Sequence, residues 1–122
     1  MKKAKYQWHP IPGMPLTEVD KKVMYWEKKG RLVPSRKLIK LPEQIEGIRK
    51  SGLLNTAVLD CVEKNIREGI STAEIDRLVY EYTMDHRGIP ATLGYHGFPN
   101  SCCISVNEVV CHGIPNENQV LH

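Results

Sequence analysis

The sequence predicts an α/β (α+β) domain that is preceded by a basic N-terminal extension. Residues 41–88 repeat apolar side chains every three or four positions, which is typical of amphipathic helices. Residues 102–111 hold two short β-prone runs around an Asn-Glu turn. Residues 1–40 contain eleven Lys or Arg and three Asp or Glu, whereas residues 41–122 contain six and eleven. We therefore expect an extension over 1–40 and a folded body over 41–122.

Length and composition restrict the class of protein. At 122 residues the chain holds one domain or less, and 41% hydrophobic residues suffice for a core. No apolar run of about 18 residues occurs, so we expect no membrane-spanning helix. The basic start, residues 1–5, is not followed by the apolar segment of a secretory signal. We therefore expect a cytoplasmic protein whose four cysteines are reduced.

The extension is expected to hold one short helix. Three prolines between Pro10 and Pro15 favour polyproline II or turns, as in a stiff linker. Thr17 is a suitable N-cap for a helix that reaches Lys29. The net charge of +8 over 1–40 (eleven minus three) suits a segment that binds a polyanion, and it equally suits a solvated tail.

The body is expected to open with two helices. Pro42 is a favourable first helical residue, and the apolar period continues until Gly69 stops the helix. The sequence Ser71–Glu74 is a capping box that starts a second helix, which Gly88 ends. Gly52 weakens the first helix by roughly 1 kcal/mol, which predicts that it packs closely against another element.

After Pro90 the apolar period changes to that of strands. Cys102–Val106 and Val109–Cys111 are short β-prone runs, and Asn107-Glu108 between them is expected to form a turn. The coarse order of the chain is therefore extension, helix, helix, loop, strand, turn and strand.

His112 and His96 are the candidate functional residues. Each is followed by a glycine, which allows a positive φ or a close approach of the backbone, and soon after by a proline. An imidazole can donate or accept a proton near pH 7, although either histidine could instead be a structural group in a turn. Tyr95 and Phe98 flank His96 and could wall a small apolar pocket or simply cover the core.

The cysteines do not have the spacing of a metal site. Cys102 and Cys103 are adjacent, so on a strand they would point to opposite faces, and no Cys-x-x-Cys occurs. Cys111 and His112 would face apart for the same reason, so a nucleophilic pair is not expected. Cys103 fits better as a small, polarizable pocket wall. The residues alone predict a pocket with histidines and no metal site.

Leu93–Pro99 and Ser101–Pro115 together closely resemble type I methionine aminopeptidases, above all in the run Ser-Val-Asn-Glu-Val-Val-Cys-His-Gly-Ile-Pro. The similarity covers roughly residues 41–122. It implies the pita-bread fold of the creatinase/aminopeptidase type, of which this chain would form the first half. It also implies a metal-dependent hydrolase that removes the initiator methionine from new proteins with a small second residue.

The resemblance also assigns roles to individual residues. His112 matches the catalytic histidine that hydrogen-bonds the scissile peptide and stabilises the transition state, and His96 matches a second histidine near the substrate. Asn107 and Val109 match residues whose carbonyls can hold a monovalent cation. The other expected substrate-binding residues are Tyr95, Phe98, Cys103 and Thr92.

The family's cofactors and partners follow from the same resemblance. Two divalent metal ions (cobalt, manganese, iron or zinc) are held by two aspartates, a histidine and two glutamates, all after the His-Gly-Ile-Pro motif. The chain ends at His122, before the first ligand is expected, so we assign no metal ligand here and expect the 122-residue chain alone to be inactive. The expected partners are the N-termini of nascent polypeptides and the ribosome, the latter through residues 1–40, with no membrane and no DNA.

Two other functional interpretations stay open at this point. The chain could be a non-catalytic peptide-binding module or pseudo-enzyme fragment that keeps the pocket and lacks the metals. It could also be a ribosome-docking element in which the basic extension dominates.

Overall fold

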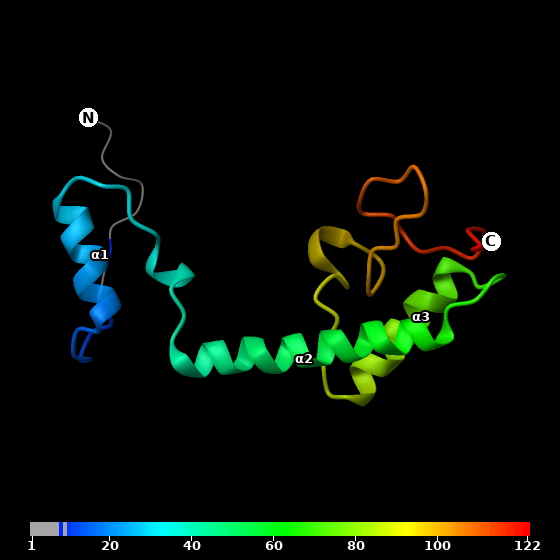
Figure 1. The fold of residues 1–122 in the computed structure, drawn as a ribbon, viewed down its shortest axis with the longest axis horizontal. Helices are drawn as coiled ribbons and strands as arrows, with labels where there is room; N and C mark the ends of the chain where they lie inside the picture. Colours follow the sequence, from blue (N-terminus) through cyan, green and yellow to red (C-terminus); the bar gives the residue numbers. More distant parts are fainter. Residues whose placement is uncertain (1–7, 9) are drawn as a thin grey trace. The chain divides into compact units, whose positions relative to one another are not determined.

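The computed structural model describes Trp8 and residues 10–122, so the basic start at residues 1–5 lies outside the described residues. In chain order the elements are α1 (Glu18–Lys28), the 3₁₀ helix η1 (Arg36–Leu38), α2 (Pro42–Asn65), α3 (Thr72–Asp85) and the 3₁₀ helix η2 (Tyr95–Gly97) (Figure 1). The chain divides into two compact units, Met1–Ile45 and Glu46–His122. None of the helices in the described part combines the length and hydrophobicity that crossing a membrane requires.

The first unit is built around α1. The Thr17 hydroxyl accepts a hydrogen bond from the Asp20 N–H at 3.1 Å, and the Asp20 carboxylate accepts one from the Thr17 N–H at 2.9 Å. This capping box confirms the predicted helix and its Thr17 cap. The indole of Trp8 also donates to Asp20 Oδ1 at 3.0 Å, and both side chains are buried. Asp20 therefore caps the helix and ties the preceding segment to it.

The predicted first helix of the body is confirmed as α2, although it ends at Asn65, before Gly69. The Asn65 side chain donates to the Cys61 carbonyl at 2.8 Å, one turn back in the last turn of the helix. Gly69 has a φ of 83°, where the chain turns toward α3. Its N–H donates to the Leu121 carbonyl at 2.9 Å, which joins the turn to the last residues of the chain.

The close packing predicted for Gly52 is wrong in this structure. A Cβ built on Gly52 would meet nothing within 4 Å, whereas one on Gly88 would lie 2.5 Å from Leu54 Cδ2. Gly88 follows the end of α3 and donates its N–H to the Thr83 carbonyl at 2.8 Å. The backbone therefore approaches Leu54 on α2 closely at Gly88 and not at Gly52. Around Gly52, α2 keeps large apolar side chains exposed, namely Ile48, Leu53 and Leu59.

The two predicted strands, Cys102–Val106 and Val109–Cys111, do not form. In residues 10–122 the structure has no strand, and the β pairing recorded there is one isolated bridge between Ser71 and Val120. The turn at Asn107-Glu108 is present, with Asn107 at a φ of 52°. Outside the turn itself, one backbone hydrogen bond joins the two arms, which are residues 102–106 before the turn and residues 109–113 after it. It runs from the Ile104 N–H to the Gly113 carbonyl at 2.9 Å. A lone pair of strands is marginal without a third strand or a packed face, which explains the incomplete ladder.

Two glycine substitutions are expected to have opposite effects on the stability of the chain. Gly52→Ala should raise the free energy of unfolding by about 0.5–1 kcal/mol, because the helix gains a residue of higher propensity and the site is open. Gly88→Ala should lower it by about 1–3 kcal/mol, because Leu54 and Thr83 must move. Urea unfolding of both variants measures the effect. A destabilised Gly52→Ala would show that this face of α2 is covered in solution.

Candidate functional site

His96 lies in a loop that closes on itself. The Thr92 hydroxyl donates to the Ser101 carbonyl at the base of the loop, and within it the Gly94 N–H donates to the Phe98 carbonyl at 2.8 Å. η2 occupies the tip, and Gly94 on its N-terminal side has a φ of 77°. His96 itself has φ 48° and ψ 32°, the left-handed region that few non-glycine residues adopt. The backbone of this histidine is therefore held in a strained conformation.

The other predicted pocket residues lie on the same loop or directly after it. The Tyr95 and His96 rings meet edge to face with centroids 4.4 Å apart, and Tyr95 is 68% exposed. Phe98 and Thr92 are half-buried, while Cys103 is exposed. The structure thus gathers these residues in one stretch, and their exposure shows that the described loop does not enclose a pocket by itself.

His112 is exposed and also has a positive φ, 56°. Left-handed backbone at a non-glycine residue costs of the order of 1–3 kcal/mol and is concentrated at functional sites. The next residue, Gly113, has no room for a side chain, since an ideal Cβ would lie 2.0 Å from the Ile104 carbonyl oxygen. The close approach that the His-Gly pattern suggests is therefore present beside His112.

Asn107 and Val109, whose carbonyls are predicted to hold a monovalent cation, lie in the turn and directly after it. Asn107 occupies the left-handed position of the turn, and the Val109 N–H donates to the Val106 carbonyl at 3.2 Å. Their role as carbonyl ligands of a monovalent cation stays a prediction.

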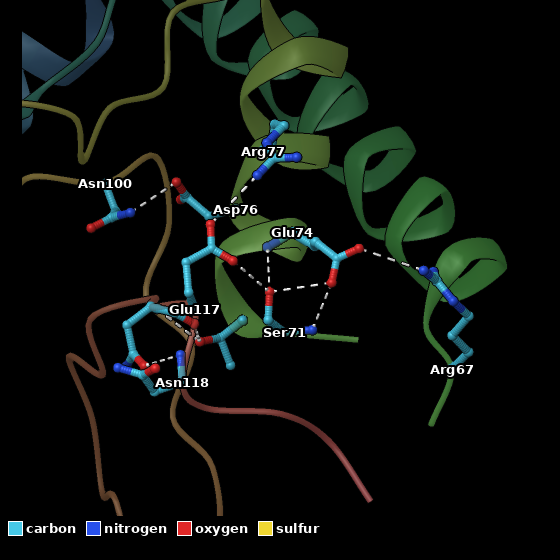
Figure 2. A network of polar contacts seen from close by, with 10 residues as sticks. Arg67, Ser71, Glu74, Asp76, Arg77, Asn100, Glu117 and Asn118 are labelled. Carbon is cyan, nitrogen blue, oxygen red and sulfur yellow. Dashed lines mark hydrogen bonds and ion pairs between the residues drawn. The ribbon is translucent and has the colours of Figure 1, made fainter. Parts of the chain in front are cut away.

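The side chain that fixes the base of the His96 loop comes from α3. Asp76 Oδ1 accepts from the N–H groups of Ser101 at 2.8 Å and Cys102 at 3.1 Å. Asp76 Oδ2 accepts from Asn100 Nδ2 at 2.9 Å (Figure 2). The sequence predicts no anchoring role for Asp76, because its partners lie 24 to 26 residues further along the chain.

The segment after His112 is fixed by the first turn of α3. Thr72 is fully buried, and its hydroxyl donates to the Asn116 carbonyl at 3.0 Å and accepts from the Asn116 N–H at 2.9 Å. Asn116 Oδ1 in turn accepts from the N–H groups of Asn118 and Gln119. This pair was also missed, since it joins residues 44 apart.

The capping box at the start of α3 is confirmed and sets the local charge. The Ser71 N–H donates to Glu74 Oε2 at 3.0 Å and holds the pKa of Glu74 below its ordinary value, with desolvation acting in the opposite direction. Arg67 approaches Glu74 at 3.5 Å (Figure 2). Nearby, burial and the Asp76 carboxylate together raise the pKa of the Cys102 thiol to about 12. Cys102 is therefore a neutral thiol, unsuited to act as a nucleophile.

The described residues do not fit a divalent-metal centre. Across Trp8 and residues 10–122, no three His, Cys, Asp or Glu side chains gather where they could hold one ion. The acidic residues of this region are used elsewhere, since Asp76 binds loop amides and Glu74 caps α3. What the arrangement offers is two exposed imidazoles, His96 and His112, each on backbone of positive φ.

Comparisons with known proteins all point to one group. A family model described as metallopeptidase family M24 matches residues 46–122. The methionine aminopeptidases of Escherichia coli (strain K12) and Buchnera aphidicola subsp. Schizaphis graminum are 48% and 46% identical to the chain over 84 residues, or 68% and 69% of it. A crystal structure of methionine aminopeptidase from Rickettsia prowazekii matches with a TM-score of 0.64 and 36% identity over 68% of the chain.

The chain spans about a third of these relatives, 32% of the two sequences and 33% of the solved chain. At this identity and TM-score, the structural match confirms the fold class that the resemblance implied, for the part of the fold that the chain covers.

Gly113→Ala tests whether the close approach beside His112 is real. The added methyl group would collide with the Ile104 carbonyl, so the Ile104–Gly113 hydrogen bond should break at a loss of about 1–3 kcal/mol. Amide exchange at Ile104 should become faster, as followed by NMR. Gly47→Ala is the control, because a Cβ there meets nothing within 4 Å. Equal exchange in both variants would show that the two arms lie further apart.

Proposed function

Because the chain belongs to metallopeptidase family M24, we propose that it supplies the substrate-binding part of a methionine aminopeptidase. Such an enzyme removes the initiator methionine from a protein whose second residue is small. The observation that carries the proposal is His112, which stands exposed and strained, beside a glycine that has no room for a side chain. The match to curated methionine aminopeptidases at 46–48% identity over 84 residues supports it.

The proposal divides the work between this chain and the rest of the relatives' length. The family is one of metal-dependent peptidases, and we assign the two divalent ions (cobalt, manganese, iron or zinc) to the part that this chain does not span. The described residues offer no ligand set for them. The contribution of this chain is to bind and orient the substrate.

His112 is the residue that would act on the scissile peptide. An imidazole N–H placed against the reacting amide stabilises the transition state more than the ground state when charge develops there. The left-handed backbone and the contact of Gly113 with Ile104 fix the direction in which the side chain leaves the chain. His96, on the loop closed by Thr92 and Ser101, would lie beside the substrate. Tyr95, Phe98 and Cys103 would form the soft, partly aromatic wall that suits a thioether side chain.

A chimaera tests the proposal directly. Residues 46–122 replace the matched segment of the Escherichia coli methionine aminopeptidase, and methionine release from Met-Ala and Met-Gly peptides is measured with cobalt, manganese or iron. We expect activity from the chimaera and none from the 122-residue chain. A folded chimaera that binds metal and releases no methionine would instead support a non-catalytic peptide-binding module. Turnover by the chain alone, well above a blank that contains only metal, would refute the division of work.

His112→Ala in the active chimaera should lower kcat by about 100-fold or more and raise KM far less, as expected when one preorganised donor is removed. Metal content should not change, because His112 is not assigned as a ligand. His122→Ala is the control, since that side chain is also an exposed histidine. Near-normal kcat would make His112 structural, and loss of metal would make it a ligand.

The basic extension supports a second part of the proposal, which is docking to ribosomal RNA in the cytoplasm, where nascent N-termini emerge. Its described cationic side chains are largely exposed and so are free to meet phosphates. They are Lys21, Lys22, Lys28, Lys29, Arg31, Lys37 and Lys40. In the described part of the chain, one of them forms a salt bridge, which joins Lys21 to Glu18 at 2.6 Å.

Binding of the 122-residue chain to ribosomes should weaken steeply between about 50 and 200 mM salt, as phosphate contacts do. Replacing Lys22 and Lys28 by Ala should weaken binding at low salt. Replacing Lys50 and Lys64, which are exposed on α2, is the charge-matched control. Equal loss in both variants would mean that net charge alone, and not the extension, drives binding.

A further inference from the structure

We propose that Asp76 is a positioning residue that holds the loop of residues 92–103 on α3 and thereby sets the affinity for the substrate. The loop carries His96 and the pocket wall. What the loop binds rests on the proposed function, whereas the anchoring itself is a property of this chain and can be tested without it.

The contacts of Asp76 are concentrated on one short segment. Oδ1 accepts two backbone N–H groups, from Ser101 at 2.8 Å and Cys102 at 3.1 Å, and Oδ2 accepts the Asn100 amide at 2.9 Å (Figure 2). Hydrogen bonds to a carboxylate are about twice as strong as neutral ones. Three such bonds to consecutive residues fix both the position and the direction of the chain where the loop ends.

Ser101 makes this anchor decisive for the loop. Its N–H is bound by Asp76 and its carbonyl by the Thr92 hydroxyl, so the two groups clamp it from opposite ends of the residue. Ser101 is 7% exposed, and a buried N–H that loses its acceptor costs about 1–3 kcal/mol. Because Thr92 and Ser101 close the base of the loop, loss of Asp76 would free the whole loop to tilt relative to α3.

The chemistry of the site explains why the residue is an aspartate. A carboxylate offers two acceptor oxygens and serves all three donors at once. An asparagine would keep one oxygen for the two backbone N–H groups, and the Asn100 amide would have to turn over to meet its NH₂ group. Asp76→Asn is therefore a conservative variant that should keep the loop in place while removing the charge. Asp76→Ala removes both the charge and the side-chain contacts that hold the loop.

The first experiment measures amide exchange in the 122-residue chain by NMR. Asp76→Ala should speed exchange at Ser101 and Cys102 by at least about ten-fold, and Asp76→Asn should restore most of the protection. Asp85→Ala is the matched control, because it removes a negative charge from the other end of α3, where the carboxylate is exposed and makes no hydrogen bond or salt bridge with the described residues. A folded Asp76→Ala chain with unchanged exchange at both amides would overturn the proposal.

The second experiment uses Cys102 as a reporter, and it decides the question even if Asp76→Ala fails to fold. Cys102 Sγ lies 3.5 Å from Asp76 Oδ1, and the carboxylate helps to raise the pKa of this thiol to about 12. Removal of the negative charge favours the thiolate, so Asp76→Asn should lower the pKa of Cys102. Alkylation of Cys102 at a fixed alkaline pH should become faster relative to Cys61 on α2. An unchanged ratio would show that Asp76 does not lie against this segment.

The third experiment separates positioning of the pocket from mere stability. In the active chimaera, Asp76→Ala should raise KM for Met-Ala peptides about ten-fold while kcat changes less, and Asp76→Asn should recover the original KM. That pattern is the reverse of the one expected for His112→Ala. A fall in kcat at constant KM would overturn the role in substrate affinity. An inactive chimaera would count against the proposed function alone, since exchange and alkylation still decide the anchoring.

Discussion

The second unit depends on the polar side chains in the first two turns of α3. Thr72 and Asp76 supply acceptors and donors to loop backbone that follows the helix in sequence by 24 to 44 residues. The loops need these partners because buried backbone N–H and carbonyl groups must be paired, and the recorded β pairing of residues 10–122 is a single bridge. The N-terminal turns of one helix thus pair loop backbone groups that a sheet pairs in most α/β domains.

The same contacts explain how two histidines can hold an unfavourable backbone. His96 and His112 both have positive φ values, 48° and 56°, and neither is a glycine. Such strain persists only where the surrounding structure determines the conformation. For His96 that support is the closed loop held at Ser101, and for His112 it is the Gly113–Ile104 contact with the Thr72–Asn116 pair beyond it. The backbone at both histidines is therefore fixed by surrounding contacts, and under the proposed function this would orient the imidazoles toward a peptide.

The sequence predicts well what depends on neighbouring residues. The Thr17 and Ser71 caps, the presence of the three helices and the turn at Asn107 follow from local rules, and the structure contains them, although α2 and α3 end before the predicted stops at Gly69 and Gly88. The strands fail, because β-prone composition cannot supply the third strand that a pair needs. Asp76 and Thr72 escape notice for a related reason: a polar residue in an early helical turn looks like an ordinary surface group until its distant partner is known. Gly52 shows the opposite error. Its low helix propensity predicts a closely packed neighbour, but a Cβ at Gly52 would meet nothing within 4 Å.

The exposed apolar side chains of α2 and the incomplete pairing of residues 102–113 have one interpretation in common. Both are surfaces that a sheet would complete, and the chain spans only about a third of its relatives. In such a fold the anchors of the histidine loops lie within this third, whereas the described residues gather no metal ligands. Under the proposed function, positioning of the substrate would depend on α3 and the loops it holds. Substitutions there should then change how the peptide is bound and oriented without changing metal content, because the proposal assigns the metal ions to the part of the relatives that this chain does not span.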